Sequence, residues 1–203
     1  MTTTVFSSSA TSGGLGPVFI YKASGDGLVV NPGVTLTSGF LTVSARSGLT
    51  DLEATINGTL AATMGIKAVG SSMHLEVGST GRMGSFNASF DSSVDNHGFI
   101  RGLHVIGTTD SSVENWGTVS GSGVGFSNFY GDDSIGHATF INHGTVDSWR
   151  YGIVARNTDA DIVNDGTISA KWWGIATVII YVCDPLTRVT QTPMLRVSQG
   201  DAR

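Results

Sequence analysis

One pattern recurs along this chain of 203 residues, and its clearest copy reads Phe140-Ile141-Asn142-His143-Gly144-Thr145-Val146. Residues 113–119 repeat it as Val-Glu-Asn-Trp-Gly-Thr-Val, and residues 162–168 as Ile-Val-Asn-Asp-Gly-Thr-Ile. Each copy has the form apolar, any residue, Asn, any residue, Gly, Thr, apolar. Alternate positions share one character, as expected of a β-strand, whose successive side chains point to opposite faces. The pattern therefore predicts short strands joined by turns.

Further copies follow at regular intervals. Residues 94–100 replace only the Thr, residues 56–60 are shorter by one residue, and residues 29–36 and 75–78 are degenerate copies. The anchoring glycines fall at positions 33, 58, 78, 98, 117, 144 and 166, with a mean spacing of about 22 residues. A second mark, a Gly followed by an apolar residue, occurs at Gly125, Gly152 and Gly174. Each of these lies eight residues after an anchoring glycine.

A fixed period of this size is typical of stacked structural repeats, with one coil per repeat. The sequence therefore predicts an all-β chain that forms a single right-handed parallel β-helix, or β-solenoid. We expect about seven rungs with irregular termini. The expected divisions are an N-terminal lead-in or cap (residues 1–27), the β-helix repeats (28–175) and a C-terminal segment (176–203).

The pattern stops near Ala176, and two interpretations of the last segment remain open. It is either a final strand with a cap, which solenoids need to block end-to-end stacking, or a truncated tail that is out of register with the repeats. The second interpretation predicts end-to-end self-association of the chain.

Stacked rungs lie about 4.8 Å apart, so like residues come to lie above one another. We expect a ladder of asparagines at one corner, because Asn is able to adopt left-handed backbone angles and to hydrogen bond its neighbours' amides. Its members are Asn31, Asn57, Asn96, Asn115, Asn142 and Asn164. Glycines two residues later, or one residue later in the shortened copy at Asn57, give the tight turns. Those assigned to the ladder motif are Gly33, Gly58, Gly98, Gly117, Gly144 and Gly166.

Composition excludes several classes. Charged residues make up 13% of the chain, about half the usual share, and 11 Lys and Arg against 16 Asp and Glu give a net charge of −5. Nucleic acid therefore has no basic surface to bind. Apolar residues are scattered, so no membrane-spanning segment is expected. The single Cys183 excludes an intrachain disulfide.

The repeats resemble those of bacterial autotransporter passenger domains and related secreted haemolysin-like proteins. The resemblance rests on residues 140–146 followed by Tyr151-Gly152-Ile153, and on residues 162–168 followed by Gly174-Ile175. It covers about residues 28–175 and implies a β-helix of the pectin-lyase-like type. It also implies a scaffold or adhesin in the extracellular space or on the bacterial cell surface, although residues 1–9 do not read as a signal peptide.

Function on solenoids usually resides on loops or on one exposed face. The widest spacing places the largest loop at residues 126–139. We expect an adhesin-like region that meets a host or environmental surface, or a glycan, through aromatic and charged side chains. The candidates are Phe129, Tyr130, Asp132, Asp133, Trp149, Arg150 and Tyr151, with Phe126, Trp172 and Trp173 as further aromatic residues for stacking on sugar rings.

An enzyme is the alternative, because a β-helix can also serve a polysaccharide lyase or a glycoside hydrolase. Such enzymes need a base with calcium-holding carboxylates, or paired carboxylates. The available residues are Asp132, Asp133, Asp147, Arg150 and Arg156, which form no recognisable motif. The catalytic residues of such an enzyme are therefore unknown.

No cofactor is expected, with calcium as the alternative. His97 and His143 occupy one slot of the repeat but lie two rungs apart, which is too far for one zinc ion. Asn157, Asp159 and Asp161 are spaced like the start of a calcium loop, but Ile162 stands where such a loop needs Gly.

An ice-binding face is a third possible function. It rests on two neighbouring rows of outward side chains, the first of which consists of threonines. Phe99 interrupts the first row, and Asp147 interrupts the second. The members of the first row are Thr59, Thr118, Thr145 and Thr167.

Overall fold

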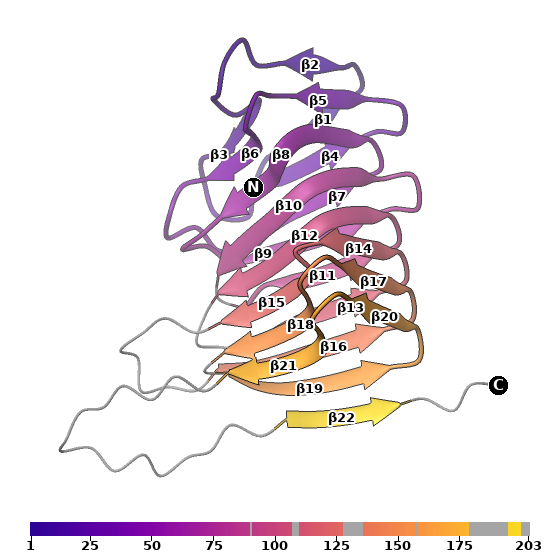
Figure 1. Cartoon of the computed structure of the whole chain (residues 1–203). Coiled ribbons are helices and arrows are strands. Elements are labelled where there is room, and N and C mark those ends of the chain that lie inside the picture. Colours follow the sequence, from indigo (N-terminus) through magenta and orange to yellow (C-terminus); the bar gives the residue numbers. More distant parts are fainter. Residues whose placement is uncertain (90, 107–109, 128–135, 157, 179–194, 200–203) are drawn as a thin grey trace.

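The chain folds into β-strands that are stacked in parallel. The computed structural model describes residues 1–89, 91–106, 110–127, 136–156, 158–178 and 195–199, and these contain strands but no helix. Every strand pairing among them is parallel and joins one repeat to the next, as Figure 1 shows. The predicted all-β right-handed solenoid of about seven turns is confirmed.

The strands form two sheets. The first contains, in spatial order, β1 (Thr3–Phe6), β4 (Gly27–Val30), β7 (Leu52–Ile56), β9 (Met73–Val77), β11 (Ser93–Asn96), β13 (Ser111–Asn115), β16 (Gly136–Asn142), β19 (Thr158–Asn164) and β22 (Leu195–Gln199). The near half of the second contains β2 (Ala10–Thr11), β5 (Thr35–Thr37), β8 (Thr59–Ala68), β10 (Arg82–Ser89), β12 (Phe99–Ile106), β14 (Thr118–Gly121), β17 (Thr145–Ser148) and β20 (Thr167–Ala170).

The far half of the second sheet is made by the ends of the long strands β8, β10 and β12 and by shorter strands. These are β3 (Phe19–Tyr21), β6 (Leu41–Ala45), β15 (Val124–Ser127), β18 (Tyr151–Arg156) and β21 (Trp173–Val178). Each complete coil therefore runs along the first sheet, turns, and crosses the second sheet in two steps.

Both ends of the chain contribute strands to this stack. Residues 1–27 supply β1, β2 and β3, which pair with β4, β5 and β6. At the other end, β22 pairs with β19 from Ala160–Leu195 to Asn164–Gln199. Within the described residues, no strand pairs with the outer edges of β20 and β21. End-to-end association through these edges stays a prediction.

Inward side chains form apolar columns because equivalent positions of successive coils are in register. One column of the first sheet contains Leu28, Ala54, Leu75, Val94, Val113, Phe140 and Ile162. All are at most 3% exposed. A fully buried side chain of this size contributes about 1.5–3 kcal/mol relative to exposure, so the columns supply most of the favourable free energy of folding.

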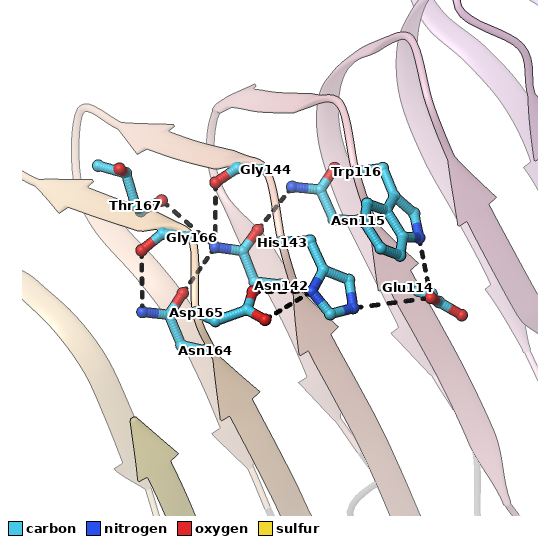
Figure 2. A network of polar contacts seen from close by, with 10 residues as sticks. All are labelled: Glu114, Asn115, Trp116, Asn142, His143, Gly144, Asn164, Asp165, Gly166 and Thr167. Carbon is cyan, nitrogen blue, oxygen red and sulfur yellow. Dashed lines mark hydrogen bonds and ion pairs between the residues drawn. The ribbon is translucent and has the colours of Figure 1, made fainter. Parts of the chain in front are cut away.

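A column of asparagines closes the corner after the first sheet (Figure 2). Nδ2 of Asn96 donates to Oδ1 of Asn115 at 2.6 Å. Asn115 donates in the same way to Asn142, and Asn142 to Asn164, each at 2.7 Å. Asn96, Asn115 and Asn142 are fully buried. A buried amide without partners is costly, so the column is stable because each member serves the next.

Asn31 and Asn57 do not belong to this column, and the predicted six-member ladder is corrected to four. The strand register aligns Asn96 with Val77, Val77 with Ile56, and Ile56 with Val30. Earlier coils thus hold a buried apolar side chain where later coils hold Asn. Asn31 and Asn57 lie one residue further along, where they are partly exposed.

The ladder asparagines do not use the left-handed backbone angles that Asn is able to adopt. Among described residues other than Gly, only Asp51 and Asp91 have positive φ, at 56° and 34°. Each ladder Asn is the last residue of a strand, with extended backbone.

The turn glycines are required mainly by close stacking. Of the six motif glycines, only Gly33 has a left-handed φ, at 77°. A Cβ on Gly144 would overlap the carbonyl oxygen of Gly117, and a Cβ on Gly166 would overlap that of Gly144. The absence of side chains at these positions lets consecutive turns touch.

Candidate binding site

The second corner of the solenoid, between the two halves of the second sheet, changes in character along the stack. In one coil the turn between β14 and β15 consists of small residues, with Gly121 and Gly123 at φ of 80° and 81° and Ser122 between them. Only glycine adopts such angles without strain. This turn is tight and projects no large side chain.

The next two coils place bulky residues at the same corner. The turn between β17 and β18 carries Trp149 and Arg150, and the turn between β20 and β21 carries Trp172. Backbone hydrogen bonds fix these turns, from N of Trp149 to O of Gly121 at 3.1 Å and from N of Trp172 to O of Arg150 at 3.0 Å. The small turn therefore lies directly beside one large turn, which is followed by a second large turn in the next coil, and a hollow is left above the small turn.

The hollow is a partly open pocket of about 330 Å³. Small residues of β12, β15 and the small turn contribute to it, while Trp149, Arg150 and Tyr151 line its other side. Gly125 stands in register between His104 and Val154. A Cβ added there would lie 3.0 Å from Cδ2 of His104, so the imidazole packs close to the bare backbone of Gly125.

Aromatic rings and one guanidinium gather beside the pocket. Cζ of Arg150 lies 4.9 Å from the ring centroid of Tyr151 and 5.2 Å from that of Trp172. The ring of Tyr151 lies edge-on to Trp172 at 5.7 Å and tilted against Trp173 at 5.6 Å. We call Trp149, Arg150, Tyr151, Trp172 and Trp173 the aromatic corner.

Three tryptophans of the aromatic corner are largely exposed to solvent. Trp149, Trp172 and Trp173 are 62%, 56% and 60% exposed. Indole is among the most apolar surfaces a protein can present, and a cluster of exposed apolar side chains usually marks an interaction site.

The pocket has a cationic lining. Arg150 and Arg156 line it together with His104, and its lining within the described residues includes no Asp or Glu. Burial, followed by the charge of Arg156, lowers the pKa of His104. The imidazole is therefore held neutral at a pH where an exposed histidine begins to protonate.

The structure brings together only part of the predicted site. Trp149, Arg150 and Tyr151 lie at the pocket, as does Arg156, which the sequence offers as a candidate for an enzyme. Phe129, Tyr130, Asp132 and Asp133 lie outside the described residues, as does most of the 126–139 loop. Asp147 lies on β17 between Ser120 and Ser169 and does not line the pocket.

His104 is absent from the predicted site because the alignment of the repeats by their glycines is shifted by two residues at this corner. Gly123, not Gly125, is in register with Gly152 and Gly174. Alignment of Gly125 with Gly152 in the sequence was therefore wrong, because Gly125 lies opposite His104 on one side and Val154 on the other. A search for the larger residue opposite each strand glycine would have found His104.

The outer side of the asparagine corner carries a second column, which is drawn in part in Figure 2. His97 stacks on Trp116 at 6.3 Å, and Trp116 stacks on His143 at 3.9 Å. Nδ1 of His143 lies 2.7 Å from Oδ1 of Asp165, and Nε1 of Trp116 donates to Glu114 at 2.8 Å.

An indole ring thus stands between the two imidazoles of this column. No group of three or more potential metal ligands is present among the described residues. The column is held by contacts between its own members.

Of the candidate residues for calcium binding, only Asp161 is described together with its side chain. Asp161 lies in the extended strand β19, with Oδ2 3.7 Å from Nε2 of His137. Asn157 and the side chain of Asp159 lie outside what the structure describes, and calcium binding there stays a prediction.

In the threonine row proposed for ice binding, Arg82 and Phe99 stand between Thr59 and Thr118. The guanidinium of Arg82 lies 4.9 Å from the Phe99 ring centroid.

Comparisons with protein families, curated proteins and solved structures find no match to this chain. Over the described residues, there is no helix long and apolar enough to cross a membrane.

Proposed function

We propose that this β-solenoid is a non-enzymatic scaffold of a bacterial secreted or cell-surface protein, and that it binds a glycan through the aromatic corner. Its role is adhesin-like: it holds a surface and does not transform it. The resemblance of the repeats to passenger domains supports this location and role. The observation that carries the proposal is the gathering of three exposed tryptophans around Arg150 and Tyr151.

Indole and phenol faces suit the apolar faces of sugar rings, while the edges of Tyr and Trp provide hydrogen bonds. Sites of this kind bind tightly when a few large aromatic residues are already ordered, because little side-chain entropy is then lost. Arg150 lies against two of the rings, and the turns that carry them are fixed by backbone hydrogen bonds.

The scaffold also favours binding through a repeated surface. Each turn of the corner is positioned by the coil before it, through the hydrogen bonds from N of Trp149 to O of Gly121 and from N of Trp172 to O of Arg150. Tyr151 and Trp173 are paired in the sheet register, which sets their rings one rung apart. Consecutive sugar units of a glycan can follow such a line of rings.

The test is retention on an immobilised glycan panel, combined with an assay of the glycan for new reducing ends and unsaturated products. We expect retention without turnover. The double variant Trp172→Ala, Trp173→Ala is expected to bind at least tenfold more weakly. The control is Trp116→Ala, because Trp116 is 51% exposed but lies at the other corner.

Two results would contradict the proposal. Release of new ends would favour the lyase or hydrolase. Equal losses of binding in the Trp116→Ala control and in the double variant would show that the aromatic corner is not the binding site.

A further inference from the structure

We propose that the C-terminal end of the solenoid is a docking surface for a second copy of this chain. The two copies form a closed dimer with a two-fold axis, in which β22 of each copy pairs with the open edge of the second sheet of the other. This inference is independent of the proposed function, because it rests on the end of the strand stack and needs no ligand.

The C-terminal end of the stack is stepped. β22 adds one further strand to the first sheet, in parallel register with β19 from Ala160–Leu195 to Asn164–Gln199. Within the described residues, no strand follows β20 and β21 in the second sheet. The first sheet therefore extends one strand beyond the second, and Figure 1 shows β22 in this last position.

The lower side of the step exposes the ends of two apolar columns. Val146 and Ile153 are fully buried, because β20 and β21 lie beside them in the next coil. Ile168 and Ile175 continue the same two columns, and both are only partly buried. A further strand at this edge would remove their apolar surface from water, which is worth about 25 cal/mol per Å².

The backbone of β20 also has an outer side that no described strand covers. N of Thr167 and N of Lys171 both donate to backbone oxygens of the preceding coil, at 2.9 and 3.1 Å. Alternate residues of a strand direct their N–H groups to opposite neighbours, so the N–H groups of Ile168 and Ala170 point away from β17. An edge of this kind is a template for pairing with another strand.

The stepped end fits a second copy of itself. Each coil runs along the first sheet and returns along the second in the opposite direction, as β19 and β21 show in Figure 1. A half-turn about an axis between the two sheets, parallel to the strands, exchanges the sheets of the second copy. Its β22 then lies antiparallel to β20 and β21 of the first copy, and the equivalent contact forms on the other sheet. Both steps are filled, as a self-complementary two-fold interface requires.

The sequence of β22 suits a strand that is paired on both sides. Its Leu195 and Val197 are in register with the buried Ala160 and Ile162, and polar residues alternate with them. This alternation is typical of a strand with one face toward an apolar core. In the dimer, the strand pairs with β19 of its own chain and with the open edge of the other copy.

The N-terminal end does not fit the stepped end. β1, β2 and β3 place one strand before each of β4, β5 and β6, so this end is level. Stacking of β1 on β22 would leave a gap one strand high over β20 and β21. Two level ends also match, but β1, β2 and β3 have only four, two and three residues, whereas β20, β21 and β22 have four, six and five. Very short edge strands are a common means of preventing such pairing.

Sedimentation velocity of the full chain, from dilute to concentrated solution, tests the proposal. We expect an equilibrium between monomer and dimer with no larger species. Ala170→Pro is expected to weaken the dimer at least tenfold, because proline has no N–H to donate at the open edge. Thr11→Pro is the matched control at the level end, where N of Ser12 donates to O of Thr37 and the N–H of Thr11 therefore faces outward. It should leave the dimer unchanged.

Ile168→Lys is a second variant, which keeps the backbone N–H groups. Its ammonium group can reach water in the monomer but would be buried at the interface, so we expect the same loss of dimer. Melting temperatures in dilute solution, within a few degrees of the unsubstituted chain, establish that each variant is folded.

Three results would overturn the inference. A chain that stays monomeric at every concentration has no docking surface at this end. Species larger than a dimer, or loss of association in Thr11→Pro, would indicate head-to-tail stacking. Undiminished dimers of folded Ala170→Pro or Ile168→Lys would place the interface elsewhere. None of these results bears on whether the aromatic corner binds a glycan.

Discussion

Trp116 stacks on His143 with ring centroids 3.9 Å apart and planes inclined by 24°, although the two residues come from different coils. They occupy the same position in consecutive turns, directly outside the asparagine column (Figure 2). The molecule is thus organised by contacts between equivalent positions of neighbouring coils, and most single substitutions act on a column of residues.

The asparagine column is the first such case. Asn142→Ala removes the donor to Asn164 and the acceptor of the shortest hydrogen bond of Asn115, at 2.7 Å; the buried amide of Asn115 keeps only longer bonds of 3.3 and 3.4 Å to backbone oxygens. We expect a loss of about 2–4 kcal/mol of unfolding free energy, since each unsatisfied buried group costs about 1–3 kcal/mol. Urea denaturation measures it. Asn57→Ala is the control, with an expected change within about 0.5 kcal/mol, and a similar loss in both variants would contradict the four-member column.

Close stacking of the turns gives a second prediction. Gly144→Ala places a methyl group against the carbonyl of Gly117, which is backbone and cannot rotate away. We expect a loss of about 2 kcal/mol or more, as for other strained insertions into packed regions. Thermal unfolding measures the effect. Gly13→Ala has open space around it and should change the melting temperature little. Unchanged stability of Gly144→Ala would mean that the coils have room between them for a methyl group.

Tyr21 predicts a response to alkali. Its hydroxyl donates to the backbone oxygen of Glu53 at 2.6 Å, and burial, with the charges of Asp26 and Glu53, raises its pKa far above 10. A raised folded-state pKa means that stability is full below about pH 10 and is lost as the pH rises beyond it.

Tyr21→Phe tests this response. At pH 7 the free energy of unfolding of the variant should be about 1 kcal/mol lower, because the hydrogen bond is absent. Above pH 10 its stability should decline much less than that of the unsubstituted chain. Denaturation at pH 7 and pH 10.5 measures both. Tyr151→Phe is the control, and an alkaline decline that Tyr21→Phe leaves unchanged would contradict the assignment.

His104 predicts a response to mild acid in the absence of ligand. Its folded-state pKa is lowered by burial and by Arg156, so the unfolded chain takes up a proton first as the pH falls. Stability is therefore full above about pH 6.5 and declines as the pH falls below that value. The melting temperature between pH 7.5 and 5 measures this decline.

His104→Gln is expected to flatten the profile, whereas His74→Gln, at an exposed histidine, should keep it. A profile that stays equally steep without His104 would assign the acid response to another group.

The sequence predicted the solenoid because the signals for it are local. Alternation within residues 140–146 fixes which side chains point inward, and the recurrence of Asn142 at Asn115 and Asn164 sets these strands in the register that the structure has. The same reasoning failed at Asn57, because Asn57 is followed directly by Gly58, whereas His97 separates Asn96 from Gly98. The turns 57–58 and 97–98 both have two residues, so Asn57 falls in its turn while Asn96 is the last residue of its strand.

The binding site was predicted only in part, for a related reason. Trp149, Arg150 and Tyr151 stand out in the sequence as aromatic and charged residues beside a repeat. Their neighbour in the pocket, His104, lies more than forty positions earlier and two rungs away, and it is placed there by the register through Gly125. No local pattern connects it with Arg150.

The sequence by itself determined that this chain forms stacked coils, which faces are apolar and where the turns fall, because these depend on period and alternation along one strand. The tertiary structure alone decided which residues meet across coils: the Asn96 column in place of a longer ladder, and a pocket where a small turn at Ser122 lies beside the large turn at Trp149. The physical reason is that contacts between coils depend on which residues of each coil fall in a strand and which fall in a turn. A motif that lacks one residue, such as Asn57-Gly58, therefore alters which side chains stack.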